Sequence, residues 1–315
     1  MEYLWLTLGL LALVLGGEFL VKGAVSIALK AKISPLVVGM TVVSFGTSAP
    51  ELLVSLSAVF DGYPDVSVGA VVGSNISNIG LVLGITVLIF PIAVNRDSLR
   101  IDWQLMILAT FLFYFFAMNG ELSWWEGTVF LAILSTFTFW LIRRSRRKGV
   151  QLAAESEVED LDSGNPVYKD ILFLSIGMVA LYFGAEWLID SVVSIANSQG
   201  VSEKLISVTI VAFGTSLPEL VTSAMAAFRK ETDISIGNLV GSNIFNIFAI
   251  LGVTSVLHPL KISDSINQFD VYFLLGISLL LLPIMLFGKK IGPWKGVFLI
   301  IFYAFYIYFS IVAEK

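Results

Sequence analysis

Two glutamates lie inside apolar stretches of this chain that are long enough to cross a lipid bilayer. Glu51 ends the motif GTSAPE, and Glu219 ends the closely similar motif GTSLPE. A carboxylate at mid-membrane costs at least about 2.5–3.5 kcal/mol, so an ionisable side chain there marks a functional site by default. Because this setting occurs twice, the two glutamates predict a cation-binding site.

Each glutamate belongs to a longer duplicated block. Residues 42–55 match residues 210–223, and residues 65–84 match residues 233–252, with 21 of 34 positions identical at a constant offset of 168. The proline before each glutamate has no amide hydrogen, so it leaves a carbonyl one turn earlier unpaired and kinks or breaks the helix. Unpaired carbonyls beside a carboxylate are hard oxygen ligands, the kind that suits Ca²⁺.

Hydroxyl groups recur at spacings of three or four around both glutamates, which places them in one polar stripe along an apolar helix. The stripe of the first copy consists of Ser44, Thr47, Ser48, Glu51 and Ser55. The second copy repeats it with Thr215, Ser216, Glu219 and Ser223, while Ala212 takes the place of Ser44.

The same residues also have a purely structural interpretation. Ser48-x-x-Glu51 and Ser216-x-x-Glu219 are formal capping boxes, and we expect this capping to occur. Capping does not explain why an ionisable group was used twice at mid-membrane, so the cation site is the preferred interpretation for both glutamates.

A second motif, GSNIxNI, follows in each copy. Ser74 and Asn78 are one helical turn apart, as are Ser242 and Asn246, so each pair shares a helix face. We expect Asn78 and Asn246 to offer carbonyl ligands to the site, and the asparagine three residues before each to hydrogen-bond between helices. Nearby glycines at small-xxx-small spacing predict close packing against the broken helix.

The composition is that of a polytopic membrane protein. Of 315 residues, 57% are hydrophobic and only 14% are charged, whereas soluble domains are about 25% charged. The chain has no cysteine, which excludes disulfides and thiolate metal chemistry. Nothing in the sequence implies a cofactor, a nucleic-acid partner or a protein partner.

A transmembrane helix needs about 20 apolar residues, and on that count the chain is predicted to be all-α with ten transmembrane helices. They are expected near residues 3–28, 36–60, 66–90, 103–119, 124–142, 170–196, 204–228, 234–257, 269–287 and 294–312. Five fall in each half, so the second half enters the membrane from the opposite side. The chain is therefore predicted to form two inverted five-helix repeats with broken helices at the centre.

The expected organisation is a first repeat at 1–142, a solvated cytoplasmic linker at 143–168 and a second repeat at 169–315. The run RRSRRK at the start of the linker predicts that this end of the fifth helix is cytoplasmic. Fifteen basic residues then lie inside and three outside, and both termini are extracytoplasmic.

The motifs GTSAPELLVS and GTSLPELVTS, each followed by GSNIxNI, resemble the two α-repeats of the Ca²⁺/cation antiporter superfamily, and most closely prokaryotic sodium/calcium exchangers. The resemblance implies a multi-pass protein of a prokaryotic inner or plasma membrane that exchanges Ca²⁺ for Na⁺ by alternating access and is not an enzyme. Its partners are these ions and the bilayer, and its first and sixth helices slide across the core. The ligands that the resemblance implies are Glu51, Glu219, Thr47, Ser48, Ser74, Asn78, Thr215, Ser216 and Ser242, with backbone carbonyls from Ser44 and Ala212.

Asn246 departs from the family pattern, because sodium/calcium exchangers often carry an aspartate there. Two carboxylates instead of three leave open the ion ratio and whether H⁺ or K⁺ replaces or joins Na⁺. Two other classes are alternatives. A cation channel would favour rings of charge around a symmetric pore, and an intramembrane hydrolase would need a histidine cluster or a cysteine nucleophile beside the glutamates.

Overall fold

The computed structural model describes residues 2–94, 101–155, 166–199, 214–288 and 290–313, and almost all of them are helical. Within these ranges seven helices are long and apolar enough to cross a membrane, or eight if one bent pair counts as a single span. In lipid, each helix pairs its backbone polar groups internally, which is why a chain of this composition folds in this way.

The helix boundaries follow the predicted ones, with one clear difference. The first half contains α1 (Glu2–Ala31), α2 (Pro35–Val38), α3 (Ser44–Thr47), α4 (Ala49–Phe60), α5 (Pro64–Ser77), α6 (Leu83–Ile89), α7 (Trp103–Ala117) and α8 (Trp124–Glu155). The second half contains α9 (Val167–Ser198), α12 (Leu217–Phe228), α13 (Thr232–Phe245), α14 (Gly252–Leu257), α15 (Val271–Leu286) and α16 (Pro293–Ala313). The difference is α8, which continues past residue 142. The first part of the expected linker is thus helical, because its Arg, Lys, Gln, Leu and Ala residues are good helix formers.

The helix that carries Glu51 is broken, as predicted. α3 and α4 meet at Ser48 with a bend of 44°, and Ser48 itself has φ −91° and ψ 5°. Ser216 has almost the same conformation before α12, with φ −88° and ψ 3°. Pro50 and Pro218 lie in the first turn that follows, where a missing amide hydrogen costs least. Of the helix predicted at 204–228, residues before 214 lie outside the described ranges.

Segments of π-helix also occur within or next to helices of the described chain, including the one that carries Glu51. They are η1 (Gly39–Val43), η2 (Asn78–Val82), η5 (Asn246–Leu251) and η6 (Ile266–Asp270). η2 and η5 each begin at an asparagine that the sequence predicted to be a ligand. Such wide turns occur often at functional sites, and nothing in the sequence pattern predicted them.

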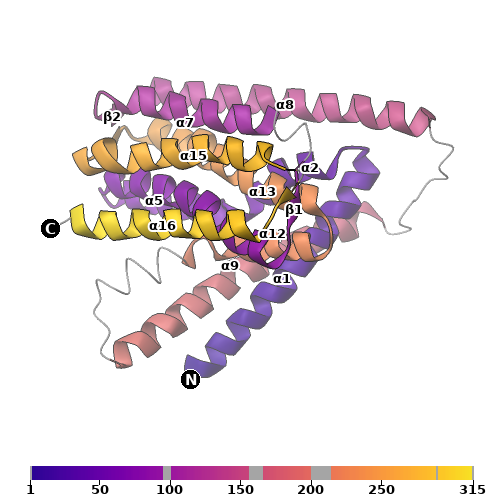
Figure 1. The fold of residues 1–315 in the computed structure, drawn as a ribbon, viewed down its shortest axis with the longest axis horizontal. Helices are drawn as coiled ribbons and strands as arrows, with labels where there is room; N and C mark the ends of the chain where they lie inside the picture. The colour runs from indigo at the N-terminus through magenta and orange to yellow at the C-terminus, as the bar shows by residue number, and fades with distance from the viewer. Residues whose placement is uncertain (1, 95–100, 156–165, 200–213, 289, 314–315) are drawn as a thin grey trace.

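α1 and α9 pack side by side as an inclined pair next to the bundle (Figure 1). Gly9 contacts Gly184, and Gly16 contacts Gly177, so the two helices run antiparallel. A Cβ atom added at any of these four glycines would lie 2.6–2.9 Å from a main-chain atom of the other helix. The pair is therefore held by close backbone approach, which is typical of small residues at membrane helix interfaces.

Two short antiparallel strand pairs join the halves at their loops. β1 (Ile92–Ala93) pairs with β4 (Lys290–Ile291), and β2 (Glu121–Leu122) pairs with β3 (Leu260–Lys261). Each pair thus ties a loop of the first half to a loop of the second. The sequence predicted only turns and charge clusters here, because a strand of two residues has no periodicity to detect.

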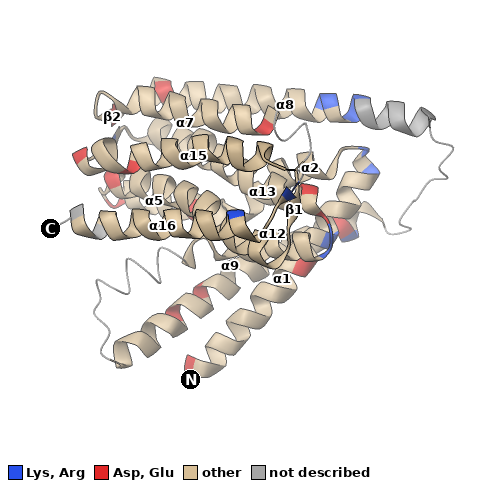
Figure 2. Cartoon of the chain, viewed as in Figure 1, with Lys and Arg blue, Asp and Glu red and all other residues tan. Residues whose placement is uncertain are grey.

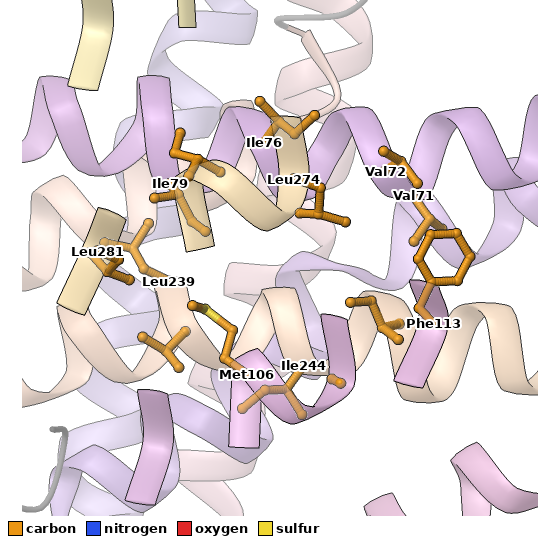
Figure 3. Close-up of a cluster of buried hydrophobic side chains, with 14 of the residues drawn as sticks. Val71, Val72, Ile76, Ile79, Met106, Phe113, Leu239, Ile244, Leu274 and Leu281 are labelled. Carbon is orange, nitrogen blue, oxygen red and sulfur yellow. The ribbon is translucent and has the colours of Figure 1, made fainter. Parts of the chain in front are cut away.

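The helices with the GSNIxNI motif run through the middle of the molecule. In the most apolar stretch of Thr232–Leu257, 83% of the residues are buried, and the corresponding share is 72% for Pro64–Ile89 and only 17% for α16. Side chains such as Ile79, Met106 and Leu239 form the apolar cluster around them (Figure 3). The second motif of each half is therefore fixed at the centre of the bundle.

Charged residues are sparse along the bundle. Lys and Arg gather mainly at the end where α8 extends past the other helices (Figure 2). Two ion pairs link elements near that end, one between Lys30 and Asp170 and the other between Glu18 and Arg229. The second of these connects α1 to the C-terminus of α12.

Candidate cation site

Both predicted glutamates are buried in the interior of the bundle and do not face lipid. The exposed fraction is 4% for Glu51 and 0% for Glu219. Each lies in the first turn of a helix, α4 or α12, where the helix dipole favours negative charge. Ser48, three residues before Glu51, hydrogen-bonds to the carboxylate of Glu219. The structure therefore brings together two acidic groups that are 168 residues apart in the sequence.

The predicted capping boxes do not form. Neither Ser48 nor Ser216 makes a side-chain capping hydrogen bond to its own helix. Instead, the Oγ of Ser48 donates a hydrogen bond of 3.1 Å to Oε1 of Glu219. The expectation of capping was wrong because the break turns Ser48 toward the other half of the molecule, where an ionisable acceptor is the stronger partner.

Several buried oxygens at the break have no hydrogen-bond partner among the described residues. They are Oε1 and Oε2 of Glu51, Oε2 of Glu219 and Oγ of Ser216. A buried polar atom without a partner costs about 1–3 kcal/mol, and a charged one costs more. A cation is the kind of group that satisfies several such oxygens at once.

Thr47 connects the first broken helix to α13 of the second half. Its Oγ1 donates a hydrogen bond of 3.1 Å to Oδ1 of Asn238 and lies 3.5 Å from Oγ of Ser242. Ser44, one turn earlier, donates through Oγ to the main-chain oxygens of Gly39 and Asn238. The main-chain oxygen of Ser44 accepts from the amide of Ser48 at 2.9 Å and lies 3.4 Å from Oγ1 of Thr47.

Asn246 connects α13 to the GSN motif of the first half. Its Nδ2 donates to Oγ of Ser74 at 3.1 Å and to Oδ1 of Asn75 at 3.0 Å. Its Oδ1 is buried and has no partner in the described chain. The amide is therefore oriented with its nitrogen toward the first half and its oxygen available to a ligand.

Asn78, the counterpart of Asn246, is placed differently. Neither Nδ2 nor Oδ1 of Asn78 has a hydrogen-bond partner in the described chain. Together with Asn243 it lines a small cavity of about 10 Å³ whose other walls are apolar, among them Met106 and Leu239. Asn78 therefore faces this cavity, whose other walls come mainly from α7, α13 and α15.

The glycine prediction is confirmed for Gly237 and Gly241 and is wrong for Gly80 and Gly84. A Cβ on Gly237 would lie 2.6 Å from the main-chain oxygen of Leu36, and one on Gly241 would lie 2.3 Å from Oγ of Ser44. α13 is therefore pressed against the broken helix of the other half. Gly80 and Gly84 serve a different contact, with α16.

The remaining predicted ligands can be placed only in part. Ser216 is buried, and Thr215 is half-buried and has interaction partners in the chain. Ala212 lies outside the described residues.

Asn238 is a polar residue at this site that the sequence analysis missed. It is completely buried and hydrogen-bonds to both halves of the molecule. One signal was available, because Asn238 stands where the first copy has Ala70, and within the duplicated block 65–84 and 233–252 this is the one position where only the second copy is polar.

The chemistry of the site is that of hard oxygen ligands. The described residues contain no cluster of three or more His, Cys, Asp and Glu that could hold a metal. Two carboxylates accompanied by hydroxyl and amide oxygens suit Ca²⁺ and similar hard cations better than transition metals. Fold and site together define a helical membrane protein with a buried group of carboxylate, hydroxyl and amide oxygens shared between its two halves.

Comparison with known proteins identifies the family. The sequence model of the sodium/calcium exchanger protein family matches residues 1–143 and 169–312. The chain is 36% identical over 310 residues to the putative antiporter CaxA of Alkalimonas amylolytica, and the match covers 97% of both proteins. It is 33% identical to the sodium/calcium exchanger MaX1 of Methanosarcina acetivorans, again over 97% of both.

A solved structure agrees with this assignment. The sodium-calcium exchanger NCX_Mj, soaked with zero Na⁺ and Ca²⁺, superposes with a TM-score of 0.83 at 32% identity, covering 100% of this chain and 99% of that one. The chain belongs to the sodium/calcium exchanger protein family. It is a multi-pass membrane transport protein and not an enzyme, as the resemblance implied.

Proposed function

We propose that this protein exchanges Ca²⁺ for Na⁺ by alternating access, with Glu51 and Glu219 as the charged ligands of one shared pocket. The observation that carries the proposal is the burial of both carboxylates at two helix breaks, with Ser48 of one half hydrogen-bonded to Glu219 of the other. Family membership and the similarity to MaX1 and NCX_Mj support the choice of ions.

The pocket takes its other oxygens from both halves. Thr47, Ser48 and Ser74 supply hydroxyl oxygens from the first half, and Thr215, Ser216 and Ser242 supply them from the second. Asn246 offers its amide oxygen, which its two donated hydrogen bonds orient, and Asn78 is the amide ligand of the first half. Ser44 and Ala212 contribute main-chain oxygens. No cofactor takes part, and Ca²⁺ and Na⁺ are the transported substrates.

The architecture that fits this site is ten transmembrane helices in two inverted repeats, 1–142 and 169–315, joined by the segment 143–168. Three observations support it: the reciprocal pairing of β1 with β4 and of β3 with β2, the glycine contacts that pair α1 with α9, and the clustering of basic residues at one end. With that end cytoplasmic, both termini are extracytoplasmic in a prokaryotic plasma or inner membrane.

Charge neutralisation explains why such a pocket exchanges ions instead of leaking them. With both glutamates ionised the empty pocket carries two negative charges, and uncompensated buried charge is very costly. One Ca²⁺ or two Na⁺ neutralise it, so the loaded forms cross the membrane and the empty form does not. If three Na⁺ move per Ca²⁺, one net charge crosses per cycle, which is worth about 2.3 kcal/mol per 100 mV.

Coupling to K⁺ is the second candidate. The mouse sodium/potassium/calcium exchanger 4 is 30% identical to this chain, but over only 49% of it. The neutral Asn246 leaves room for a different set of ions than three carboxylates would take. Coupling to H⁺ and a cation channel remain outcomes of the test.

The deciding experiment is ⁴⁵Ca²⁺ uptake into proteoliposomes loaded in turn with Na⁺, K⁺ or H⁺. Uptake that requires internal Na⁺ supports the proposal, and uptake that requires K⁺ together with Na⁺ supports the second candidate. Uptake driven by an outward H⁺ gradient alone would replace Na⁺ by H⁺. Flux that ignores the internal ion indicates a channel and contradicts the exchanger mechanism.

A further inference from the structure

Asn238 is a buried amide that lies between the two halves of the site and was not among the predicted ligands. Its side chain is fully buried on α13 and hydrogen-bonds to residues of both halves. Its Oδ1 accepts from Oγ1 of Thr47 at 3.1 Å, and its Nδ2 donates to Oγ of Ser223 at 3.0 Å. One amide thus bridges α3 of the first half and α12 of the second half.

The direction of these hydrogen bonds fixes which atom of Thr47 faces the pocket. A threonine hydroxyl has a single hydrogen and two lone pairs. Two acceptors lie within reach of that hydrogen, Oδ1 of Asn238 at 3.1 Å and the main-chain oxygen of Ser44 at 3.4 Å. The nearer one is Oδ1 of Asn238, so the hydrogen of Thr47 points at Asn238, and the lone pairs remain for another partner. Ser223 in turn holds the amide in this orientation, since its Oγ accepts from Nδ2.

α13 places Asn238 by main-chain contacts that do not depend on its side chain. Gly237 and Gly241 bring the helix against α2, η1 and α3, and the main-chain oxygen of Asn238 accepts from Oγ of Ser44 at 3.1 Å. Ser235, one turn earlier, donates to the main-chain oxygen of Ser223 at 2.9 Å. Replacing the side chain therefore leaves the helix packing in place.

The first half lacks the equivalent bridge. Ala70 occupies the position that corresponds to Asn238, and Ser55 and Ser67 correspond to Ser223 and Ser235. The Oγ atoms of Ser55 and Ser67 are buried and have no partner among the described residues. The bridge is thus a one-sided feature of an otherwise duplicated site.

We infer that Asn238 is a positioning residue for the cation site: it takes the hydroxyl hydrogen of Thr47 and so makes the Thr47 oxygen a cation ligand. The inference rests on the proposed function, because it assumes that the pocket at Glu51 and Glu219 binds Na⁺ or Ca²⁺. Asn238 itself does not touch the ion, since both of its side-chain polar atoms are already bonded to protein.

The test is a double-mutant cycle between Asn238→Leu and Thr47→Val, two substitutions of nearly equal shape that remove only polarity. The readouts are the half-saturating concentrations of Ca²⁺ and Na⁺ for ⁴⁵Ca²⁺ exchange in proteoliposomes, the maximal rate, and the thermal stabilisation of purified protein by each ion. Loss of one hydrogen bond to a ligand predicts that Asn238→Leu raises the half-saturating concentration of at least one ion by about threefold to tenfold. In the Thr47→Val background the same change has an effect of less than about twofold, because the group that it positions is gone.

Two matched controls separate positioning from general damage. Thr254→Val removes a buried hydroxyl of α14 that donates to its own helix, and it leaves both half-saturating concentrations unchanged. Asn238→Asp keeps an acceptor for Thr47, so Thr47→Val costs as much in that background as in the natural protein.

Equal effects of Asn238→Leu with and without the Thr47 hydroxyl would overturn the inference, as would an unchanged affinity for both ions. If Asn238→Leu fails to fold, Asn238→Ala takes its place in the same cycle with Thr47→Val, because it removes the same acceptor. Thermal stabilisation of the purified protein by each ion measures ion binding without transport, so it separates this inference from the proposed function. Natural protein that binds the ions but does not exchange them refutes the exchange mechanism, while the cycle still measures the coupling between Asn238 and Thr47. Natural protein that binds neither ion refutes both.

Discussion

The two copies of the motif have nearly the same residues but different hydrogen bonding. Glu219 accepts from Ser48, whereas neither oxygen of Glu51 has a partner in the described chain. Asn246 donates two hydrogen bonds, whereas Asn78 donates none there. At both pairs of counterparts the side chain of the second half is hydrogen-bonded to the described chain, and the side chain of the first half is not.

This difference shows that a duplicated sequence does not make a duplicated site. Buried groups that are bonded to protein hold the shape of a pocket, and buried groups without partners are the ones from which a ligand gains most. We expect the first half to contribute more to ion binding and the second half more to stability. The predictions below separate the two halves, from the largest expected effect to the smallest.

The glutamates give the largest effect. Glu51→Gln should lower ⁴⁵Ca²⁺ exchange by about 100-fold or more, because it removes half of the charge of the pocket and buries an amide in its place. Glu219→Gln should cost less, since a glutamine oxygen still accepts from Ser48. The measurement is Na⁺-dependent uptake at matched protein levels.

Exchange at the natural rate by either glutamate variant would show that the proposed site is wrong. An effect of Glu219→Gln as large as that of Glu51→Gln would show that hydrogen bonding in the protein does not predict which carboxylate the ion depends on.

At the interface of α1 and α9 the two halves should behave alike. Gly16 and Gly184 are counterparts 168 residues apart, and a Cβ on either would lie 2.9 Å from a main-chain nitrogen of the other helix. Gly16→Leu and Gly184→Leu should each destabilise the protein by at least about 1–3 kcal/mol through overpacking. Thermal unfolding in detergent checks this, and Gly276→Leu in α15, where a Cβ has only one neighbour at 3.8 Å, is the control. Clearly unequal losses at the two glycines would mean that the halves differ here as well.

The asparagines should separate stability from binding. Asn246→Leu leaves Ser74 and Asn75 without their donor, so it should lower the free energy of unfolding by about 1–3 kcal/mol in ion-free buffer. Asn78→Leu breaks no hydrogen bond to the described chain and should leave that stability unchanged or raised. The measurement is the unfolding midpoint of each variant without Na⁺ or Ca²⁺, and equal losses for the two variants would remove the distinction between the halves.

The ion pair between Glu18 and Arg229 should give the smallest effect. The counterparts of these residues are Glu186 and Asp61, two acidic groups, so only one half has the pair. The hydrogen bonds that Arg229 donates to Glu18 raise the pKa of the Arg229 guanidinium, which therefore stays charged across the usual pH range. Because exposed pairs contribute little and are screened by salt, Glu18→Gln should change the exchange rate by about twofold or less. Glu186→Gln is the matched control, and a large, salt-independent effect of Glu18→Gln would indicate a buried role for the pair.

Much of the fold follows from local features of the sequence. Long apolar runs marked the helices, and the prolines before Glu51 and Glu219 marked the breaks, because a missing amide hydrogen acts within one turn. The end of α8, the four strands and the π-turns were not predicted, since none of them leaves a periodic pattern.

The site was predicted in part. The positions of Glu51, Thr47 and Ser74 on polar stripes follow from helical spacing, and the structure places all three in the interior. The hydrogen bond predicted for Ser48 was wrong, and the role of Asn238 was missed. Both depend on contacts between helices that are distant in the sequence.

The sequence by itself determined the class of protein, the two broken helices and the acidic residue at each break, because hydropathy and proline act over one or two turns of chain. Only the tertiary structure decided which polar groups of the two halves meet and which remain unpaired. Helix packing brings together atoms about 170 residues apart, and a single difference such as Ala70 against Asn238 then changes the hydrogen bonds of one half alone.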